Sequence, residues 1–268
     1  MSGLVKASIG TMPLSGFGLV DCLVFVTGLC LGSFGGMLAA RLPAREALTG
    51  RSRCPECNQT LGPWELIPVF SFLVQRGRCK HCRGKITPGY LAVELSTAVS
   101  FFFLHRCFGL GPAGILHMAV AFHLCILAGT DIMYGLIPNK ILLSLSGFSL
   151  ALRLIGGFRP GSLGIGSYEV ASLISGFRGA ALGFGLLFAV AFIKPEAMGG
   201  GDVKMAGAIG LYLGFPNILP GLGLSFFMAA AYCIPLLLIG RLKKTDTIPL
   251  GAFFSLATIV IAVAAWPW

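Results

Sequence analysis

The stretch Met198-Gly199-Gly200-Gly201-Asp202-Val203-Lys204-Met205 places a carboxylic acid and a run of glycines at the edge of an apolar segment. An unpaired charge in such a position is costly, so the aspartate suggests a function. Asp131 also closes a long apolar run. Two carboxylates brought together by a helix bundle can form an acid-base pair, which makes Asp131 and Asp202 the candidate catalytic residues.

The composition indicates an integral membrane protein. Of the 268 residues, 56% are hydrophobic and only 11% are charged, and the mean hydropathy is +0.86. A soluble domain of this length has about a quarter of its residues charged. The net charge is +10, but the basic residues lie between apolar runs without interleaved aromatic residues. We therefore expect membrane lipids, especially anionic ones, as partners and no nucleic acid.

Apolar runs of roughly spanning length recur along the whole chain. A spanning helix needs about 17–25 residues. Seven runs are adequate, and an eighth, Val203–Phe215, is shorter. The sequence therefore predicts an all-α polytopic membrane protein with about eight transmembrane helices and an exposed loop at Gly156–Ser167. The seven longer runs are Leu19–Ala40, Tyr90–Phe108, Leu110–Thr130, Ile141–Phe158, Val170–Ile193, Ile218–Gly240 and Ile248–Trp268.

The basic residues predict the orientation of these helices. If residues 41–89 are cytoplasmic and the helices alternate, fifteen of the twenty lysines and arginines face the cytoplasm, as the positive-inside rule requires. Both termini then lie outside, and both aspartates lie at cytoplasmic helix ends. The expected units are residues 1–40, with the first helix; residues 41–89, a cytoplasmic loop; and residues 90–268, a membrane-embedded domain with both aspartates.

Four of the nine cysteines form two Cys-x-x-Cys pairs in the cytoplasmic loop. Cys54-Pro55-Glu56-Cys57 and Cys79-Lys80-His81-Cys82 are separated by 21 residues, a spacing that can bring four thiolates into a tetrahedral zinc site. A reducing cytoplasm favours metal binding over disulfides. The sequence predicts a small zinc-ribbon-like domain with structural Zn²⁺ on Cys54, Cys57, Cys79 and Cys82; reduced cysteines without metal are the alternative.

Each aspartate also has a plain structural interpretation. Gly135 and Pro138 end the helix that carries Asp131, so this carboxylate lies where protein meets cytoplasm, and it could be a snorkelling boundary residue. The glycines before Asp202 allow backbone to approach a substrate strand closely. They could equally form a flexible turn in which Asp202 caps the next helix.

A stripe of small residues favours the catalytic interpretation. Asp202, Ala206, Gly210 and Gly214 follow one another at intervals of four, so they share a helix face that permits a tight helix contact. That contact could bring Asp202 against the helix with Asp131. Two neighbouring carboxylates share a proton, so one can activate water while the other polarises a carbonyl.

Four further residues are candidates for substrate binding or support. Gly199 and Gly201 belong to the glycine run, and Lys204 follows Asp202 closely enough to act as a counter-charge or, preferably, as a headgroup anchor. Glu94 lies near the cytoplasmic start of the second predicted span. It is within possible reach of a basic substrate segment.

Four motifs of this chain resemble those of the type IV prepilin leader peptidases, which are membrane aspartic proteases of the Gly-x-Gly-Asp type, and they follow one another in the same order. Ile248-Pro249-Leu250-Gly251 is similar to a further turn of that family, and the resemblance runs from about residue 28 to 256. The chain departs from the family pattern at Gly35-Gly36, Tyr90-Leu91 and Asn139. The four motifs are Gly32-Ser33-Phe34 with Arg41-Leu42-Pro43; the cysteine pairs with Trp64, Ile67-Pro68, Tyr90 and Glu94; Asp131 with Pro138-Asn139; and Gly199-Gly200-Gly201-Asp202-Val203-Lys204.

The resemblance implies that Asp131 and Asp202 are the catalytic pair of a peptidase domain at residues 90–268. It implies a bacterial inner-membrane enzyme whose substrates are prepilins or pseudopilins of type IV pili or type II secretion, with a short basic leader that is cleaved at the cytoplasmic face, usually after a glycine. Many members with the cysteine loop also methylate the new N-terminus with S-adenosylmethionine. The resemblance alone carries this second activity, because no nucleotide-binding glycine motif is evident.

Other functions remain open at this point. A proton- or cation-coupled transporter could use Asp131 and Asp202 as ion sites, although the sequence lacks the matching halves that many transporters show. A Gly-x-Gly-Asp protease with other substrates, such as preflagellins, and a zinc-ribbon scaffold without chemistry are further alternatives. The sequence does not indicate the oligomeric state.

Overall fold

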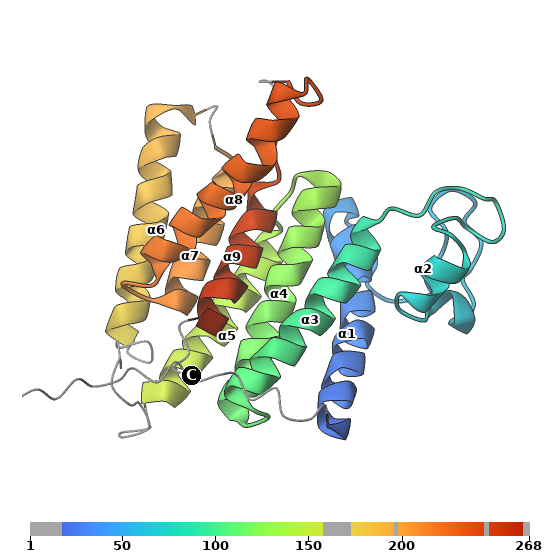
Figure 1. The fold of residues 1–268 in the computed structure, drawn as a ribbon, viewed down its shortest axis with the longest axis horizontal. Helices are drawn as coiled ribbons and strands as arrows, with labels where there is room; N and C mark the ends of the chain where they lie inside the picture. The colour runs from blue at the N-terminus through green and yellow to red at the C-terminus, as the bar shows by residue number, and fades with distance from the viewer. Residues whose placement is uncertain (1–17, 158–172, 196–197, 244–246, 265–268) are drawn as a thin grey trace, which may run out of the picture.

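Eight helices form a bundle in the computed structural model, which describes residues 18–157, 173–195, 198–243 and 247–264 (Figure 1). No strand occurs among these residues. The segment between the first two bundle helices holds a 3₁₀ turn, η1 (Pro63–Leu66), and a short helix, α2 (Phe70–Val74). The bundle helices are α1 (Leu19–Ala44), α3 (Gly89–Phe108), α4 (Pro112–Tyr134), α5 (Asn139–Gly157), α6 (Leu173–Ile193), α7 (Gly200–Leu213), α8 (Ile218–Leu238) and α9 (Leu250–Ala264).

The helices confirm the predicted all-α polytopic membrane fold. Within the described residues, α1, α3, α4, α6 and α8 are each long and apolar enough to cross a membrane, and α9 is a shorter apolar helix. The predicted loop at Gly156–Ser167 lies largely outside the described residues, although α5 extends to Gly157. The predicted start of the fifth run at Val170 also lies outside them, and α6 begins at Leu173.

Glycines set the register of α1 against α3. A Cβ atom on Gly28 would lie 2.6 Å from Cα of Ala98, and one on Gly32 would lie 2.7 Å from Cα of Glu94. Only glycine allows two helix backbones to approach this closely. The contact fixes Glu94 beside the middle of α1.

The small-residue stripe of α7 packs against α6, and the prediction that it faces the helix of Asp131 is wrong. Gly210 meets the backbone of Gly179, and Ala206 meets Gly183, both on α6. A stripe of this kind indicates a close helix contact but does not specify the partner. The contact of α7 with α6 therefore does not determine where Asp202 lies relative to Asp131.

A buried arginine donates hydrogen bonds to the carbonyl groups at the C-terminal end of α7. Arg153 of α5 is 1% exposed, and its guanidinium donates hydrogen bonds to the backbone carbonyls of Leu211 (3.0 Å) and Tyr212 (2.6 Å). These are among the last carbonyls of α7, which lack partners within the helix. Arg153 therefore links the end of α5 to the end of α7.

Both aspartates and the cysteine segment lie at the same end of the bundle. Asp131 is in the last turn of α4, Asp202 is in the first turn of α7, and the cysteine segment connects the end of α1 to the start of α3. Figure 1 shows the successive helices alternating in direction, so these ends coincide. At the opposite end, Asp21 accepts a hydrogen bond from Arg106 at 3.3 Å.

Candidate active site and metal centre

Asp131 is held by the first turn of α9. Its side chain is buried, and Oδ2 accepts a hydrogen bond from the backbone N–H of Ala252 at 3.3 Å. A Cβ atom on Gly251 would lie only 2.9 Å from the same oxygen. The unpaired N–H groups of a helix N-terminus favour a neighbouring anion. Gly251 and Ala252 thus form a close-fitting backbone cradle for Asp131.

Asp202 is the third residue of α7, and the alternative in which it caps this helix is wrong. The N-cap is Gly199, while Gly200 and Gly201 already belong to the helix. The Asp202 carboxylate nevertheless lies beside the N-cap, since a Cβ atom on Gly199 would lie 3.2 Å from Oδ2 of Asp202. The half-buried Asp202 side chain is therefore located at the helix start.

Ile137 links the two aspartate-bearing elements. A Cβ atom on Gly201 would lie 3.1 Å from Cβ of Ile137, and one on Gly251 would lie 3.2 Å from Cδ1 of the same residue. The start of α7 therefore abuts the connection that follows α4, beside the cradle of Asp131. The elements that carry Asp131 and Asp202 therefore meet through Ile137, as an acid pair requires.

The four predicted ligand cysteines form one cluster. Their sulfur atoms all lie within 4.8 Å of one another, and Sγ of Cys54 lies 3.8 Å from Sγ of Cys82. A tetrahedral zinc site with Zn–S bonds of about 2.3 Å has sulfur–sulfur separations of about 3.8 Å. The donor set and its size thus fit a metal ion such as zinc, and four protein ligands leave no position for substrate.

The two cysteine pairs have the same backbone geometry. The N–H of Asn58 donates to the carbonyl of Cys54 (2.9 Å), and the N–H of Arg83 donates to that of Cys79 (2.9 Å). Both donors, each four residues after the first cysteine of its pair, have positive φ, 56° and 61°. An isolated antiparallel bridge flanks each pair. The cluster is therefore built from two equivalent knuckles, as in zinc ribbons.

The surroundings of the cluster change the pKa values of its thiols in opposite directions. The backbone N–H of Cys57 chiefly lowers the pKa of the Cys54 thiol, to about 7. Although the N–H of Gly84 acts in the opposite direction, burial and the neighbouring thiols raise the pKa of Cys82 to about 12. Metal binding requires all four thiolates and releases their protons.

Comparison with known proteins identifies the family. Residues 26–108 match the bacterial peptidase A24 N-terminal domain, and residues 118–234 match the type IV leader peptidase family. A protein of Bacillus subtilis named prepilin leader peptidase/N-methyltransferase is 37% identical over 244 residues, which cover 89% of this chain and 92% of that protein. The chain belongs to the type IV leader peptidase family.

Other relatives extend over nearly the same length. Proteins with the same name from Burkholderia pseudomallei and Aeromonas hydrophila are 26% and 29% identical, covering 95% and 88% of this chain and 90% and 87% of their own lengths. No solved structure was found to match. These matches support the leader peptidase interpretation and give no support to the transporter alternative.

Two supporting candidates of this leader peptidase have partners within the chain. Oε2 of Glu94 accepts a hydrogen bond from the backbone N–H of Val69 at 2.8 Å, which ties the cysteine segment to α3. The exposed Lys204 donates to Oδ1 of Asn139 at 3.3 Å, which ties the start of α7 to the start of α5. Each of the two side chains thus links two segments that are distant in the sequence.

The sequence did not single out Ile137 or Ala252 as parts of the candidate site. Ile137 is an ordinary apolar residue in sequence, and Ala252 contributes a backbone N–H, which no side-chain pattern reveals. The only signal was the Ile248–Gly251 motif, which marked a turn without indicating its contact with Asp131.

Proposed function

We propose that this chain is a prepilin leader peptidase that uses Asp131 and Asp202 as its catalytic pair. The observation that supports this most directly is the cradle of Gly251 and Ala252, which holds Asp131 beside the start of α7. The names of the relatives indicate prepilins as the substrates, and the resemblance of the sequence motifs adds pseudopilins. The proposed site of action is the cytoplasmic face of the bacterial inner membrane, where the predicted orientation places both aspartates and the cysteine segment.

The acid pair can carry out both halves of peptide hydrolysis. One carboxylate takes a proton from water, whose oxygen adds to the scissile carbonyl carbon, while the other, protonated, donates to the carbonyl oxygen. When the C–N bond breaks, the leaving amine takes a proton from the pair. The protonation states belong to the two residues together. Gly199, beside the Asp202 carboxylate, would let the substrate backbone approach closely, whereas Gly201 faces Ile137 and would support the contact between the two aspartate-bearing elements.

The second proposed activity is N-methylation of the new amino terminus. The names of the relatives support it, and S-adenosylmethionine would supply the methyl group. We further propose Zn²⁺ as the ion of the four-cysteine cluster, because a closed four-thiolate site is typical of structural zinc. The cluster would then stabilise residues 41–89 as a small unit attached to the membrane domain.

A direct assay tests the function. The test substrate is a peptide with a basic leader that ends in a glycine and is followed by an apolar helix. In vesicles, the full chain is expected to cleave this peptide after the glycine. When S-adenosylmethionine is present, it is expected to add one methyl group to the new amino terminus. Mass spectrometry of the products distinguishes the two steps. A matched peptide whose leader lysines are replaced by glutamine serves as control. Proton-coupled uptake without any cleavage would instead establish the transporter.

Gly251→Ala is expected to lower kcat for this cleavage by about ten- to a hundredfold, because a displaced catalytic group loses its alignment. The added methyl group would lie 2.9 Å from Oδ2 of Asp131 and must displace the carboxylate. Gly147→Ala is the matched control, because a Cβ atom at that helical glycine meets nothing within 4 Å. Equal kcat values for the two variants would show that the cradle does not position Asp131.

A further inference from the structure

An uncharged stretch interrupts the basic cysteine segment. Residues 66–75 contain no charged side chain, whereas Glu65 precedes them and Arg76 follows them. Several of their large apolar side chains point outward: Leu73 and Val74 are both 64% exposed, and Phe70 is 55% exposed. Contiguous apolar surfaces of this kind seldom face water and usually mark an interaction site.

The cysteine segment folds back along α1. The guanidinium of Arg41, near the end of α1, donates hydrogen bonds to the carbonyls of Ala47 (3.0 Å), Thr49 (3.4 Å) and Arg51 (3.3 Å). These bonds turn the chain back immediately after the helix ends. The segment therefore does not continue outward along the helix axis, and Figure 1 shows it displaced sideways from α1 and α3.

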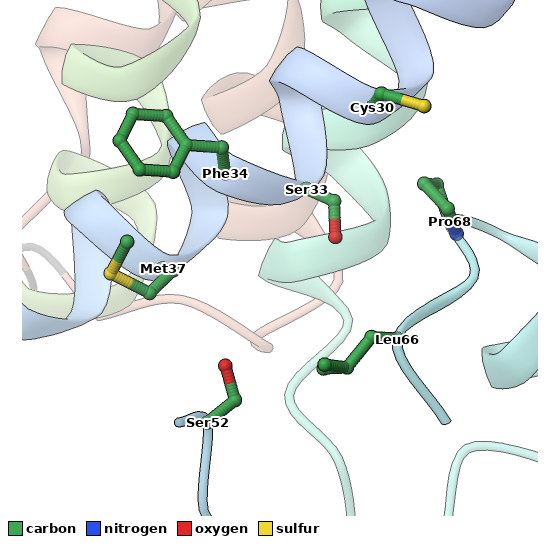
Figure 2. A pocket seen from close by; sticks show the side chains of 7 residues that line it. All are labelled: Cys30, Ser33, Phe34, Met37, Ser52, Leu66 and Pro68. Carbon is green, nitrogen blue, oxygen red and sulfur yellow. The ribbon is translucent and has the colours of Figure 1, made fainter. Parts of the chain in front are cut away.

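The uncharged stretch consequently lies at the level of the bundle. Leu66 and Pro68 face α1 across a hollow of about 270 Å³ that Ser33 and Phe34 also line (Figure 2). Ser33 precedes the last residue of α1, Ala44, by eleven residues, or about 16 Å along a helix. This position is well within the apolar run of α1.

A second contact places the stretch beside the bundle. The N–H of Val69 bonds to Glu94, and Gly32 of α1 packs against the backbone of the same Glu94. The stretch thus lies beside the middle of α1, twelve residues before the end of that helix at Ala44. A helix that crosses a bilayer is surrounded by lipid on its free side, and Phe34 of α1 is 50% exposed on the side of the hollow.

The charges beside the stretch complement a lipid surface. Arg76, Arg78 and Lys80 follow it directly and are exposed. Basic residues near a membrane are attracted to anionic headgroups, and long basic side chains extend from an apolar boundary to the headgroup region. The aromatic Trp64, at the other border, is 79% exposed; tryptophan is enriched at membrane interfaces.

We propose that residues 63–74 form an interfacial membrane element. Phe70, Leu73 and Val74 insert among the acyl chains of the leaflet on the aspartate side. Arg76, Arg78 and Lys80, which follow the element, contact anionic headgroups. The four-cysteine segment is then partly immersed beside α1 and does not only rest on the membrane surface. The segment is covalently joined to α1 at one end and to α3 at the other, so its effective concentration at the membrane is high. The immersed stretch borders the lipid from which a membrane-bound substrate would approach.

Depth-dependent fluorescence quenching tests this proposal on the full chain. The three native tryptophans, Trp64, Trp266 and Trp268, are replaced by phenylalanine, and a single tryptophan is introduced as Leu73→Trp or, as a control on a cysteine knuckle, as Gln59→Trp. The proteins are placed in vesicles of phosphatidylcholine and phosphatidylglycerol with or without bromine on the acyl chains. Retained metal content and peptide cleavage verify the fold.

Brominated lipid is expected to quench the residue-73 reporter at least about threefold more than the residue-59 reporter, since an interfacial apolar face enters the acyl-chain boundary. Aqueous iodide should quench the two in the opposite order. Equal, weak quenching by brominated lipid with strong quenching by iodide would place the stretch in water and overturn the proposal. A reporter shielded from both quenchers would indicate a protein partner, either a second copy or a substrate, and would also overturn it.

A charge placed on the same surface gives an independent measurement. Val74→Glu, added to the Leu73→Trp reporter, is expected to reduce its quenching by brominated lipid to nearly that of the residue-59 reporter, because an inserted carboxylate must leave the acyl chains. Gln59→Glu in the same reporter background adds an identical charge elsewhere on the segment and should leave the quenching unchanged. Equal effects of the two charges would contradict insertion.

Discussion

Asp131→Asn and Asp202→Asn are each expected to reduce prepilin cleavage by about three to four orders of magnitude, and the double variant should be scarcely slower than either single one. Each substitution removes a member of a pair that transfers protons as a unit, and such losses are not additive. Asparagine keeps the size of the side chain and can still accept the N–H of Ala252. The measurement is kcat per folded enzyme in vesicles with the basic-leader peptide.

The control for this experiment is a third aspartate. Asp21 is also buried and hydrogen-bonded, but it lies at the opposite end of the bundle with Arg106. Asp21→Asn should lower thermal stability while kcat of the folded fraction stays within about twofold of the wild type, because distant sites act independently. If Asp131→Asn or Asp202→Asn keeps more than a tenth of normal cleavage, the acid-pair mechanism is wrong.

Cys54→Ser is expected to remove the metal and unfold the cysteine segment. A structural zinc site in a small domain contributes about 10–16 kcal/mol of apparent folding free energy, and apart from Cys54 and Cys79 no residue from 45 to 88 is buried. Metal analysis should fall from one zinc per chain to nearly none. Trypsin should then cut at Arg76, Arg78, Lys80 and Arg83, which are exposed but constrained in the folded segment.

Cys22→Ser is the matched control for the metal site, since Cys22 is an exposed cysteine on α1 and lies outside the cluster. It should retain metal and trypsin resistance. If a chelator strips the metal from the wild type and the segment stays resistant to trypsin, the cluster does not stabilise the fold. If Cys54→Ser retains one zinc per chain, the four-cysteine assignment is wrong.

Hydropathy was sufficient to predict the bundle, because each helix that crosses a bilayer must be apolar over most of its length. The predicted run Ile218–Gly240 corresponds closely to α8 (Ile218–Leu238), and Tyr90–Phe108 to α3 (Gly89–Phe108). Cysteine spacing likewise predicted the cluster, since two knuckles of fixed geometry place their thiols together. Local sequence determines both features.

Contacts between distant segments could not be predicted in the same way. The small-residue stripe of α7, which includes Gly210, predicted a close helix contact. The sequence did not specify which helix makes that contact, and in the structure it is α6. The cradle of Asp131 depends on a backbone N–H and on the absence of a side chain at Gly251. The stretch at residues 66–75 is too short for a spanning helix and lies in a polar loop, so hydropathy alone gave no reason to place it beside α1.

The capped end of α7 has a consequence for how the protein is made. With 14 residues, α7 is about 21 Å long, too short to cross the hydrocarbon layer of about 30 Å unaided, and its last carbonyls depend on Arg153. Ribosomes deliver α5 before α7, so the guanidinium is already present when the short helix leaves the translocon. We expect α6 and α7 to enter the bilayer together as a hairpin, and Asp202 to reach Asp131 only after this late step of biogenesis.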